Sequence, residues 1–321
     1  MKVVISDDYQ DCIRGLACFA KMAGHDVVIH NDTVKGVDAI AERFKDAEAA
    51  VLIRERTPIT EELLEKLPNL RLISQTAGGI NHIDLDACTR RGIIVAAGGG
   101  NKNVTAELTW GLILAASRHI PREVQALKEG RWQTSIGNRL TGKTLGVYAY
   151  GGIGSIVSRV GHAFGMKILA WGREGSRERA AADGFEMAES REAFFETSDV
   201  VSIHIPLKPD ARGIIKAADL GRMKPTALFV NTSRAGLIEE GALLAALEAG
   251  RPGRAAVDVY EDEPVLGGNH PLLKMDNCLC SPHLGYVSIE SYEEYIGGAF
   301  DRVVAFANGA PIDVKNPEAL G

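Results

Sequence analysis

The sequence has few cysteines, no long apolar run and no strong excess of charge of either sign, and each absence excludes a class of protein. The five cysteines are an odd number and include no CxxC pair, so we expect neither a disulfide framework nor a metal site. Cys278 and Cys280 lie two apart in an apolar run. We predict that both are reduced thiols on one face of a strand.

Membrane and nucleic-acid partners are also not expected. No segment reaches the roughly 18 consecutive apolar residues that a membrane helix requires, and the stretch from Met1 to Asp8 becomes acidic too soon for a signal peptide. The net charge is only -6 and the basic residues are scattered, so no groove for a phosphate backbone is indicated. We therefore expect a cytoplasmic protein that acts on a small molecule.

Length and composition allow two domains, each with its own core, because the chain has 321 residues, 45% of them hydrophobic. Short apolar runs alternate with polar, helix-compatible stretches in two series. The first series comprises residues 3–5, 27–29, 50–53, 72–73 and 93–95, and the second comprises residues 145–149, 168–171, 200–203, 228–230 and 255–259. Strand alternating with helix predicts, for each series, a parallel sheet covered by helices on both faces.

The boundary between the two series is the run Gly98-Gly99-Gly100, followed by an apolar helix from Thr105 to Ala116. A last helix-compatible stretch, roughly Ser288 to Asn308, could return the chain to its first domain. We therefore predict an α/β fold of two doubly wound domains. A Rossmann domain at residues 99–287 is inserted into a flavodoxin-like substrate domain at residues 1–98 and 288–321.

A glycine-rich turn follows the first strand of the second series. Residues 149–154 read Ala149-Tyr150-Gly151-Gly152-Ile153-Gly154, which is the spacing of a GxGxxG turn with alanine in the first glycine position. Glycines here allow the backbone to approach a diphosphate, which the amides at a helix N-terminus then bind. Glycines in such a turn can also serve tight packing alone, but the order of strand, turn, helix and strand favours nucleotide binding.

The next strand ends at Trp171-Gly172-Arg173-Glu174, about 20 residues beyond the turn, where an acidic residue usually binds the ribose of NAD. A carboxylate would repel a 2'-phosphate, whereas Gly172 followed by Arg173 could admit one. The pattern therefore leans slightly toward NADP over NAD. Glu174 remains an alternative ribose ligand, and Arg177 could equally be a solvated surface charge.

Three polar residues downstream of the turn suggest hydride-transfer chemistry. Reduction of a ketone needs a proton donor, and the imidazolium of His283 could supply one near neutral pH. A carboxylate about 4 Å away, from Glu263, would favour the imidazolium by roughly 4 kcal/mol at an effective dielectric of 20. Arg234 could bind a substrate carboxylate through two hydrogen bonds. The alternatives are a structural histidine and a surface ion pair for the arginine.

With these motifs the sequence resembles the D-isomer-specific 2-hydroxyacid dehydrogenases, especially the phosphoglycerate dehydrogenase-like members, along essentially the whole chain. The family's catalytic Arg, Glu and His motifs match Arg234, Glu263 and His283 with their flanking residues. The likeness also covers residues 101–107, 130–132, 140–146, 204–207 and 223–225.

The resemblance implies roles for further residues. It implies that Asp258 holds the nicotinamide carboxamide and that Thr105 lies against the cofactor. The complete set of cofactor-binding residues that we predict is Thr105, Tyr150, Gly151, Gly152, Ile153, Gly154, Gly172, Arg173, His204, Pro206, Thr232 and Asp258. The substrate-binding residues that we predict are Arg54, Arg56, Ala77, Gly78, Gly79 and Asn101. Arg54 and Arg56, two apart on a strand, would share a face and could bind a second anionic group.

The sequence departs from the family pattern at Ala149, Gly172, Ala77 and Ala235. The first two leave the choice of cofactor open, and the last two could reshape the substrate pocket. The regulatory domain of some phosphoglycerate dehydrogenases is not expected, nor is serine feedback. The resemblance also implies a homodimer, for which the helix from Thr105 to Ala116 is a candidate interface, although a core helix would look the same.

We therefore expect an NAD(P)-dependent oxidoreductase that interconverts a D-2-hydroxy acid and a 2-keto acid of the phosphoglycerate, glycerate/hydroxypyruvate or glyoxylate type. The reaction would take place in a cleft between the domains, with hinges at residues 98–100 and near residue 286. One alternative is an NAD(H)-sensing protein similar to the corepressors that share this fold, although their appended tails are not seen. A formate dehydrogenase is another, but it would not need Glu263 beside the histidine.

Overall fold

The computed structural model describes residues 1–320 and divides the chain into two compact units. Unit 1 comprises residues 1–101 and 287–321, of which residue 321 is not described, and unit 2 comprises residues 102–286. Our predicted domains place the divisions at 98/99 and 287/288. Each unit has one sheet, and every pair of neighbouring strands in both sheets is parallel. The predicted fold class is therefore confirmed.

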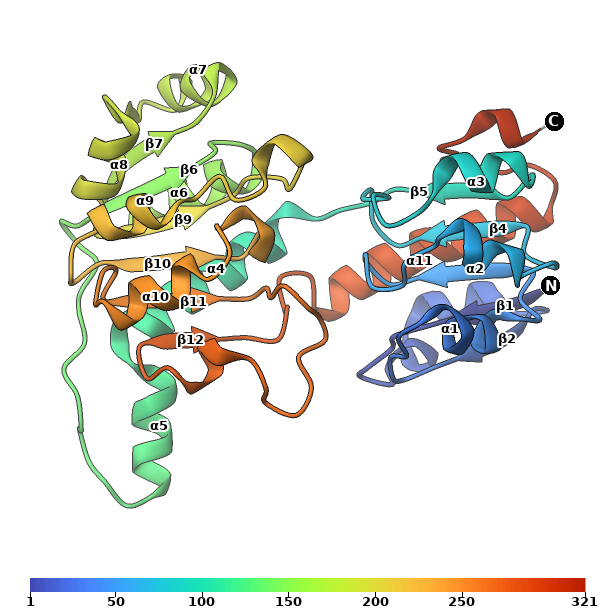
Figure 1. Ribbon diagram of the computed structural model, residues 1–321, viewed down its shortest axis with the longest axis horizontal. Coiled ribbons are helices and arrows are strands. Elements are labelled where there is room, and N and C mark those ends of the chain that lie inside the picture. Colours follow the sequence, from blue (N-terminus) through green and yellow to red (C-terminus); the bar gives the residue numbers. More distant parts are fainter. Residues whose placement is uncertain (321) are drawn as a thin grey trace. The chain divides into compact units, whose positions relative to one another are not determined.

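Unit 1 contains a five-stranded sheet in the order β2-β1-β3-β4-β5 (Figure 1). Its strands are β1 Lys2–Ile5, β2 Asp26–Ile29, β3 Ala49–Leu52, β4 Leu72–Gln75 and β5 Ile94–Ala97. Its helices are α1 Val37–Phe44, α2 Glu61–Glu65, α3 Leu85–Arg90 and α11 Ile289–Ala307, with 3-10 helices η1 Ile13–Gly15, η2 Ala17–Met22 and η6 Pro317–Leu320. The strand order reverses between β1 and β3, and ligands of such sheets bind beyond the carboxyl ends of the strands at that point.

Both faces of this sheet are covered, which is why its strands read as continuous apolar runs. Val4 and Ile73 pack into the core with residues of α1, α2 and α3. On the other face, the Ser74 hydroxyl donates a hydrogen bond to the Ala299 carbonyl of α11. The helix begins after Ser288, whose side chain accepts the Ser291 N–H and so caps it. The last helix predicted from the sequence therefore packs on the first sheet.

Unit 2 contains a seven-stranded sheet in the order β12-β11-β10-β9-β6-β7-β8. Its strands are β6 Thr144–Tyr148, β7 Lys167–Trp171, β8 Glu186–Met187, β9 Val200–Ile203, β10 Leu228–Asn231, β11 Arg254–Val257 and β12 Cys278–Cys280. Its helices are α4 Lys102–Arg118, α5 Ile120–Lys128, α6 Gly152–Ala163, α7 Glu174–Ala182, α8 Arg191–Thr197, α9 Ala217–Arg222 and α10 Ala242–Glu248, with 3-10 helices η3 Pro209–Ala211, η4 Ala235–Leu237 and η5 Pro271–Lys274. The reversal of order lies between β6 and β9, beside the glycine-rich turn.

The two faces of the second sheet have separate cores. α8, α9 and α10 cover one face around Phe194, Phe229 and Leu243. Residues of α4 and α6 cover the other, with Trp110 and Val157 among them. The apolar side of α4 thus packs largely within its own unit, and its role as a dimer interface stays a prediction. Across residues 1–320, no helix is both long and apolar enough to span a membrane.

Candidate active site

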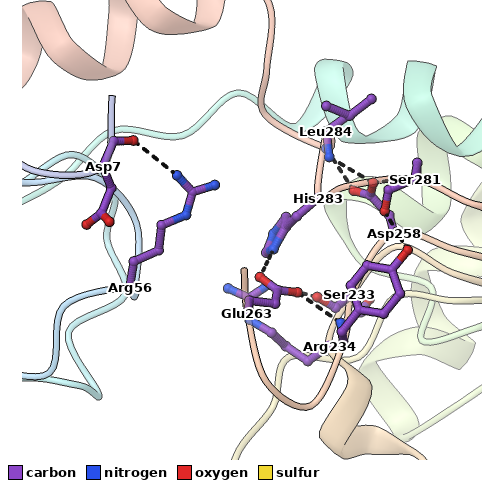
Figure 2. A network of polar contacts seen from close by, with 11 residues as sticks. Asp7, Arg56, Ser233, Arg234, Asp258, Glu263, Ser281, His283 and Leu284 are labelled. Carbon is purple, nitrogen blue, oxygen red and sulfur yellow. Dashed lines mark hydrogen bonds and ion pairs between the residues drawn. The ribbon is translucent and has the colours of Figure 1, made fainter. Parts of the chain in front are cut away.

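Two side chains beyond the carboxyl ends of β11 and β12 form an acid–base pair. His283 follows β12, and its Nδ1 lies 2.5 Å from Oε2 of Glu263, in the loop after β11 (Figure 2). The other carboxylate oxygen, Oε1, accepts the Tyr260 N–H at 2.9 Å. Only 16% and 22% of the His283 and Glu263 side chains are exposed, so water screens this pair weakly. With Nδ1 held by the carboxylate, Nε2 is the nitrogen that could exchange a proton with a ligand.

The loop that positions His283 is fixed by Asp258. This residue is fully buried at the end of β11. Its Oδ1 accepts hydrogen bonds from Ser281 Oγ at 2.6 Å and Leu284 N at 2.8 Å, and its Oδ2 accepts one from Gly285 N at 2.8 Å (Figure 2). Burial raises the pKa of Asp258, while these donors act in the opposite direction by stabilising the carboxylate.

Two further contacts restrain the same loop. The Thr105 hydroxyl of α4 donates to the Gly285 carbonyl at 2.7 Å. The ring of Tyr286 packs edge-on against His283, with ring centroids 5.7 Å apart. His283 itself has a left-handed backbone with φ 53°. Asp258 and Thr105, for which the resemblance implies contact with the cofactor, therefore also hold the histidine-bearing loop.

Arg234 follows β10 in a turn that its neighbours stabilise. The Asn231 side chain accepts the Ser233 N–H and donates to the Arg234 carbonyl, both at 3.0 Å. Ser233 Oγ donates to the carbonyl of Ile203 in β9. The Thr232 hydroxyl is buried and lies 2.8 Å from that of Thr109 in α4. Residues from β10, β11 and β12 thus place a guanidinium, a carboxylate and an imidazole beyond the same edge of one sheet.

The glycine-rich turn fits a diphosphate. α6 begins after Gly151 and has no side-chain cap, so the first amides of the helix keep their hydrogen-bonding capacity. A Cβ on Gly154 would lie 2.5 Å from the Ala149 carbonyl oxygen, so only glycine fits there. Ala149 occupies the first glycine position with φ 71°, the left-handed conformation that glycine adopts readily. The alanine therefore preserves the turn at the cost of backbone strain.

Tyr150, in the same turn, has its side chain in the core. It is fully buried, and its hydroxyl lies 2.5 Å from Asp183 Oδ2. The Arg179 side chain donates to the Tyr150 carbonyl at 2.8 Å. The side chain of Tyr150 thus packs in the core under the turn, so only the backbone of this residue could contact a cofactor.

β7 ends directly before a glycine, which two arginines in exposed ion pairs follow. Gly172 has φ 155°, and a Cβ there would lie 2.7 Å from Ser176 Oγ. Arg173 forms an exposed ion pair with Asp210 at 2.6 Å, and Arg177 lies 3.7 Å from Glu174. Exposed pairs of this kind contribute little to stability and exchange readily for another anion.

Of the predicted residues in the segment 204–207, Pro206 is exposed and His204 is half-buried. His204 Nε2 lies 3.0 Å from Ser202 Oγ, and its buried Nδ1 has no hydrogen-bond partner among residues 1–320. Burial lowers the pKa of His204 to about 4. The ring is therefore neutral near pH 7.

In unit 1 the prediction that Arg54 and Arg56 lie on a strand was wrong. β3 ends at Leu52, and Arg54 lies in a turn with φ 61°. Buried Gln75 donates to the Arg54 carbonyl at 2.8 Å, and the Thr76 hydroxyl accepts the Arg54 N–H at 3.2 Å. The left-handed backbone at Arg54 itself ends the strand alternation that would place Arg54 and Arg56 on one face.

Arg56 lies against a polar cluster that the sequence did not reveal. Its guanidinium is 4.4 Å from the centroid of the Tyr9 ring. It also lies 3.4 Å from the Asp7 carbonyl oxygen (Figure 2). The Asp7 carboxylate is buried and accepts hydrogen bonds from Ser6, Tyr9 and Thr57. A run of polar residues directly after the apolar strand β1 was the signal that could have identified it.

The other predicted substrate residues are placed as follows. Ala77 is buried, whereas Gly78 is exposed. A Cβ on Gly79 would lie 2.2 Å from the Glu55 carboxylate, so this glycine permits the loop to approach Glu55. The Asn101 N–H donates to Tyr295 at 2.9 Å. Within residues 1–320 no group of three or more histidine, cysteine or acidic side chains could hold a metal ion, and all five cysteines are free.

Comparison with known proteins is consistent with this geometry. Residues 110–285 match the NAD binding domain of the D-isomer specific 2-hydroxyacid dehydrogenases. A D-3-phosphoglycerate dehydrogenase of Methanocaldococcus jannaschii is 38% identical over 77% of the chain but only 47% of its own length. A glyoxylate reductase of Aeropyrum pernix is 37% identical over 88% of the chain and 87% of its own length.

Among solved structures, a phosphoglycerate oxidoreductase from Vibrio cholerae is 51% identical, with a TM-score of 0.94 over 97% of this chain and 100% of its own. The chain spans about half the length of several D-3-phosphoglycerate dehydrogenases that it matches. The matched domain, the sequence identities and the shared fold together show that the chain belongs to the D-isomer specific 2-hydroxyacid dehydrogenase family.

Proposed function

We propose that the protein interconverts a D-2-hydroxy acid and a 2-keto acid with NAD(H) or NADP(H). The observation that supports this most directly is the 2.5 Å contact between His283 Nδ1 and Glu263 Oε2. Both residues lie beyond the carboxyl ends of the sheet's strands, as Arg234 does. Such a pair provides a proton at Nε2 while holding the imidazolium at its other nitrogen. A nicotinamide cofactor, when bound, supplies or accepts the hydride.

The three side chains of this site would transfer the proton, stabilise its donor and orient the substrate. In the reducing direction, the proton on His283 Nε2 passes to the carbonyl oxygen of the keto acid, and Glu263 stabilises the positive charge of the ring before that transfer. Arg234 binds the carboxylate beside the reacting carbon and so fixes the orientation of the carbonyl. The backbone amides of residues 77–79 are proposed to bind the same carboxylate.

The substrate that we propose is of the phosphoglycerate, glycerate/hydroxypyruvate or glyoxylate type. The relatives with assigned names include D-3-phosphoglycerate dehydrogenases and glyoxylate reductases. Arg54, Arg56 and Asn101 are proposed to contact the substrate beyond its carboxylate. A phosphate would pair well with Arg56, but the buried Asp7 carboxylate nearby opposes a second negative charge.

We propose a modest preference for NADP over NAD. Gly172 presents no side chain to the 2' position, and Arg173 could exchange its exposed partner Asp210 for a 2'-phosphate. An aspartate at position 172 would be strained by the backbone and crowded by Ser176. Glycine thus suits the backbone of this turn and leaves the 2' position without a carboxylate from residue 172, while Glu174 remains the alternative ribose ligand.

Turnover with a panel of keto acids tests the proposal. Oxidation of NADPH and NADH is followed by absorbance with glyoxylate, hydroxypyruvate, pyruvate, 2-ketoglutarate and 3-phosphohydroxypyruvate. We expect turnover with at least one of them and a higher kcat/KM with NADPH. No turnover with any, although both cofactors bind, would contradict the enzyme assignment and favour a sensor.

We further propose a homodimer that pairs through α5 and the segment after it. Five large apolar side chains are exposed there: Ile120, Val124, Leu127, Trp132 and Ile136. Ile120, Val124 and Leu127 recur at helical spacing on one side of α5, and a two-fold pair would bury the same patch on both chains. Light scattering after gel filtration should give twice the monomer mass. Trp132→Ser should reduce that mass, whereas a monomeric wild-type protein would exclude the dimer.

A further inference from the structure

The side chain of Lys102 lies over the glycine-rich turn. A Cβ added to Gly152 would be 2.5 Å from Cδ, 2.8 Å from Cε and 2.7 Å from Nζ of this lysine. Lys102 is the first residue of α4, and Gly152 is the first residue of α6, so both contribute to one corner of unit 2. The ammonium group therefore occupies the space that any side chain at position 152 would fill.

The ammonium group of Lys102 is not neutralised by a neighbouring acidic side chain among residues 1–320. No ion pair or side-chain hydrogen bond links its ammonium to another of residues 1–320. The nearby arginines are engaged: Arg179 donates to the Tyr150 carbonyl, and Arg173 pairs with Asp210. An exposed lysine without a partner is ordinary, but one folded over an uncapped helix N-terminus places like charge against like, because that terminus is itself partly positive.

An anion between the two would resolve this arrangement. A dinucleotide diphosphate carries about two negative charges, whereas a helix N-terminus supplies the equivalent of only about half a positive charge. We propose that Lys102 is a ligand of the cofactor diphosphate, opposite the amides of α6. This inference rests on the proposed function, because it assumes a dinucleotide at the turn.

Gly152 then has a second role besides admitting the phosphate backbone. It leaves the room that the lysine stem needs to reach across the turn. A Gly152→Ala substitution meets only the flexible end of this side chain, so the fold should tolerate it while the ammonium is displaced. Weaker binding of the diphosphate is therefore expected from either Lys102→Gln or Gly152→Ala.

Binding of ADP-ribose, measured by isothermal titration calorimetry, tests the inference without turnover. ADP-ribose contains the diphosphate but no nicotinamide, so the catalytic groups do not contribute. We expect Lys102→Gln to raise the Kd about tenfold and Lys102→Arg to stay within about threefold of the wild type. Kd should also rise less steeply with salt concentration in Lys102→Gln, because one charge contact that salt screens is lost.

Lys167→Gln is the matched control, because Lys167 is exposed at the amino end of β7, at the opposite edge of the same sheet. It should bind ADP-ribose as the wild type does. Thermal melts of all variants verify folding. If Lys102→Gln and Gly152→Ala, both folded, match the wild type in Kd and salt dependence, the inference is wrong although the proposed function stands. If the wild type binds neither ADP-ribose nor either cofactor, both are wrong.

Discussion

The two units use the same edge of a parallel sheet in different ways. In unit 2 the polar side chains beyond the strands fix one imidazole: Glu263 holds His283 Nδ1, and Asp258 holds the backbone of the loop that carries His283. In unit 1 the buried Asp7 carboxylate accepts hydrogen bonds from three hydroxyls, and other buried polar side chains fix the backbone. Gln75 and Thr76 hold the left-handed turn at Arg54.

The difference indicates a division of labour. A proton transfer requires two side-chain atoms within hydrogen-bond reach, so the residues for chemistry must be fixed at their side chains. Recognition of an anion can be achieved by long side chains from a turn of defined shape. Substitutions in unit 2 should therefore change kcat, and substitutions in unit 1 should change KM.

The largest expected effect is that of His283→Ala. Removal of the proton donor should lower kcat by about 10² to 10⁴. Cofactor affinity, measured by titration of protein fluorescence, should be retained. Unchanged turnover would show that His283 is not the proton donor and that unit 2 does not carry the chemistry in the proposed way.

Arg56→Gln should produce the opposite signature. Loss of a charged contact to the substrate should raise KM about ten- to hundredfold and change kcat less. Steady-state kinetics with the best keto acid of the panel measures both. Arg43→Gln, in the same unit, is the control, because Arg43 pairs with Asp32 away from the proposed residues. A fall in kcat alone for Arg56→Gln would show that unit 1 also takes part in the chemistry.

Each unit contains one histidine whose pKa burial lowers to about 4, His82 in unit 1 and His204 in unit 2. The unfolded chain, with a histidine pKa near 6.5, binds more protons than the folded one between pH 6.5 and 4. The free energy of unfolding therefore falls as the pH falls through this window, by about 1–2 kcal/mol per histidine at pH 5.

Urea denaturation at pH 7.5 and pH 5 tests this effect. His82→Gln and His204→Gln should each lose less stability on acidification than the wild type does. An acid loss equal to that of the wild type in one variant would assign the effect to other groups in that unit.

The smallest expected effect concerns the strained alanine of the glycine-rich turn. Ala149→Gly relieves a left-handed conformation, which costs roughly 1 kcal/mol, but adds entropy to the unfolded chain. We expect a net gain of about 0.5 kcal/mol in the free energy of unfolding. Ala181→Gly, in helix α7, should instead lose about 0.5–1 kcal/mol. A loss in both would show that Ala149 is not strained.

Much of the fold could be predicted from the sequence, because buried parallel strands form continuous apolar runs. The runs in both series lie in strands, and the boundaries differ by only one or two residues, as at β11, Arg254–Val257, against the predicted 255–259. β8 was missed because it has only two residues, Glu186–Met187, neither of which forms an apolar pattern. The run ending at Ile53 gave no sign that the strand stops before Arg54.

The candidate site was partly predictable for a different reason. Each of the catalytic candidates follows a strand directly or lies in the next loop, so local order indicated the shared edge. The hydrogen bonds of Asp258 to residues 281–285 join segments far apart in sequence, and no local pattern indicates them. The position of Lys102 over Gly152 likewise depends on how two helices pack.

The left-handed backbone at His283 limits which inactive variant is suitable for capturing a bound substrate. Asparagine adopts this conformation far more readily than alanine, and it cannot act as an acid at neutral pH. His283→Asn should therefore leave the loop in its native shape while it stops turnover. For soaking or co-crystallisation with a keto acid and reduced cofactor, it is the variant of choice for trapping an unreacted ternary complex.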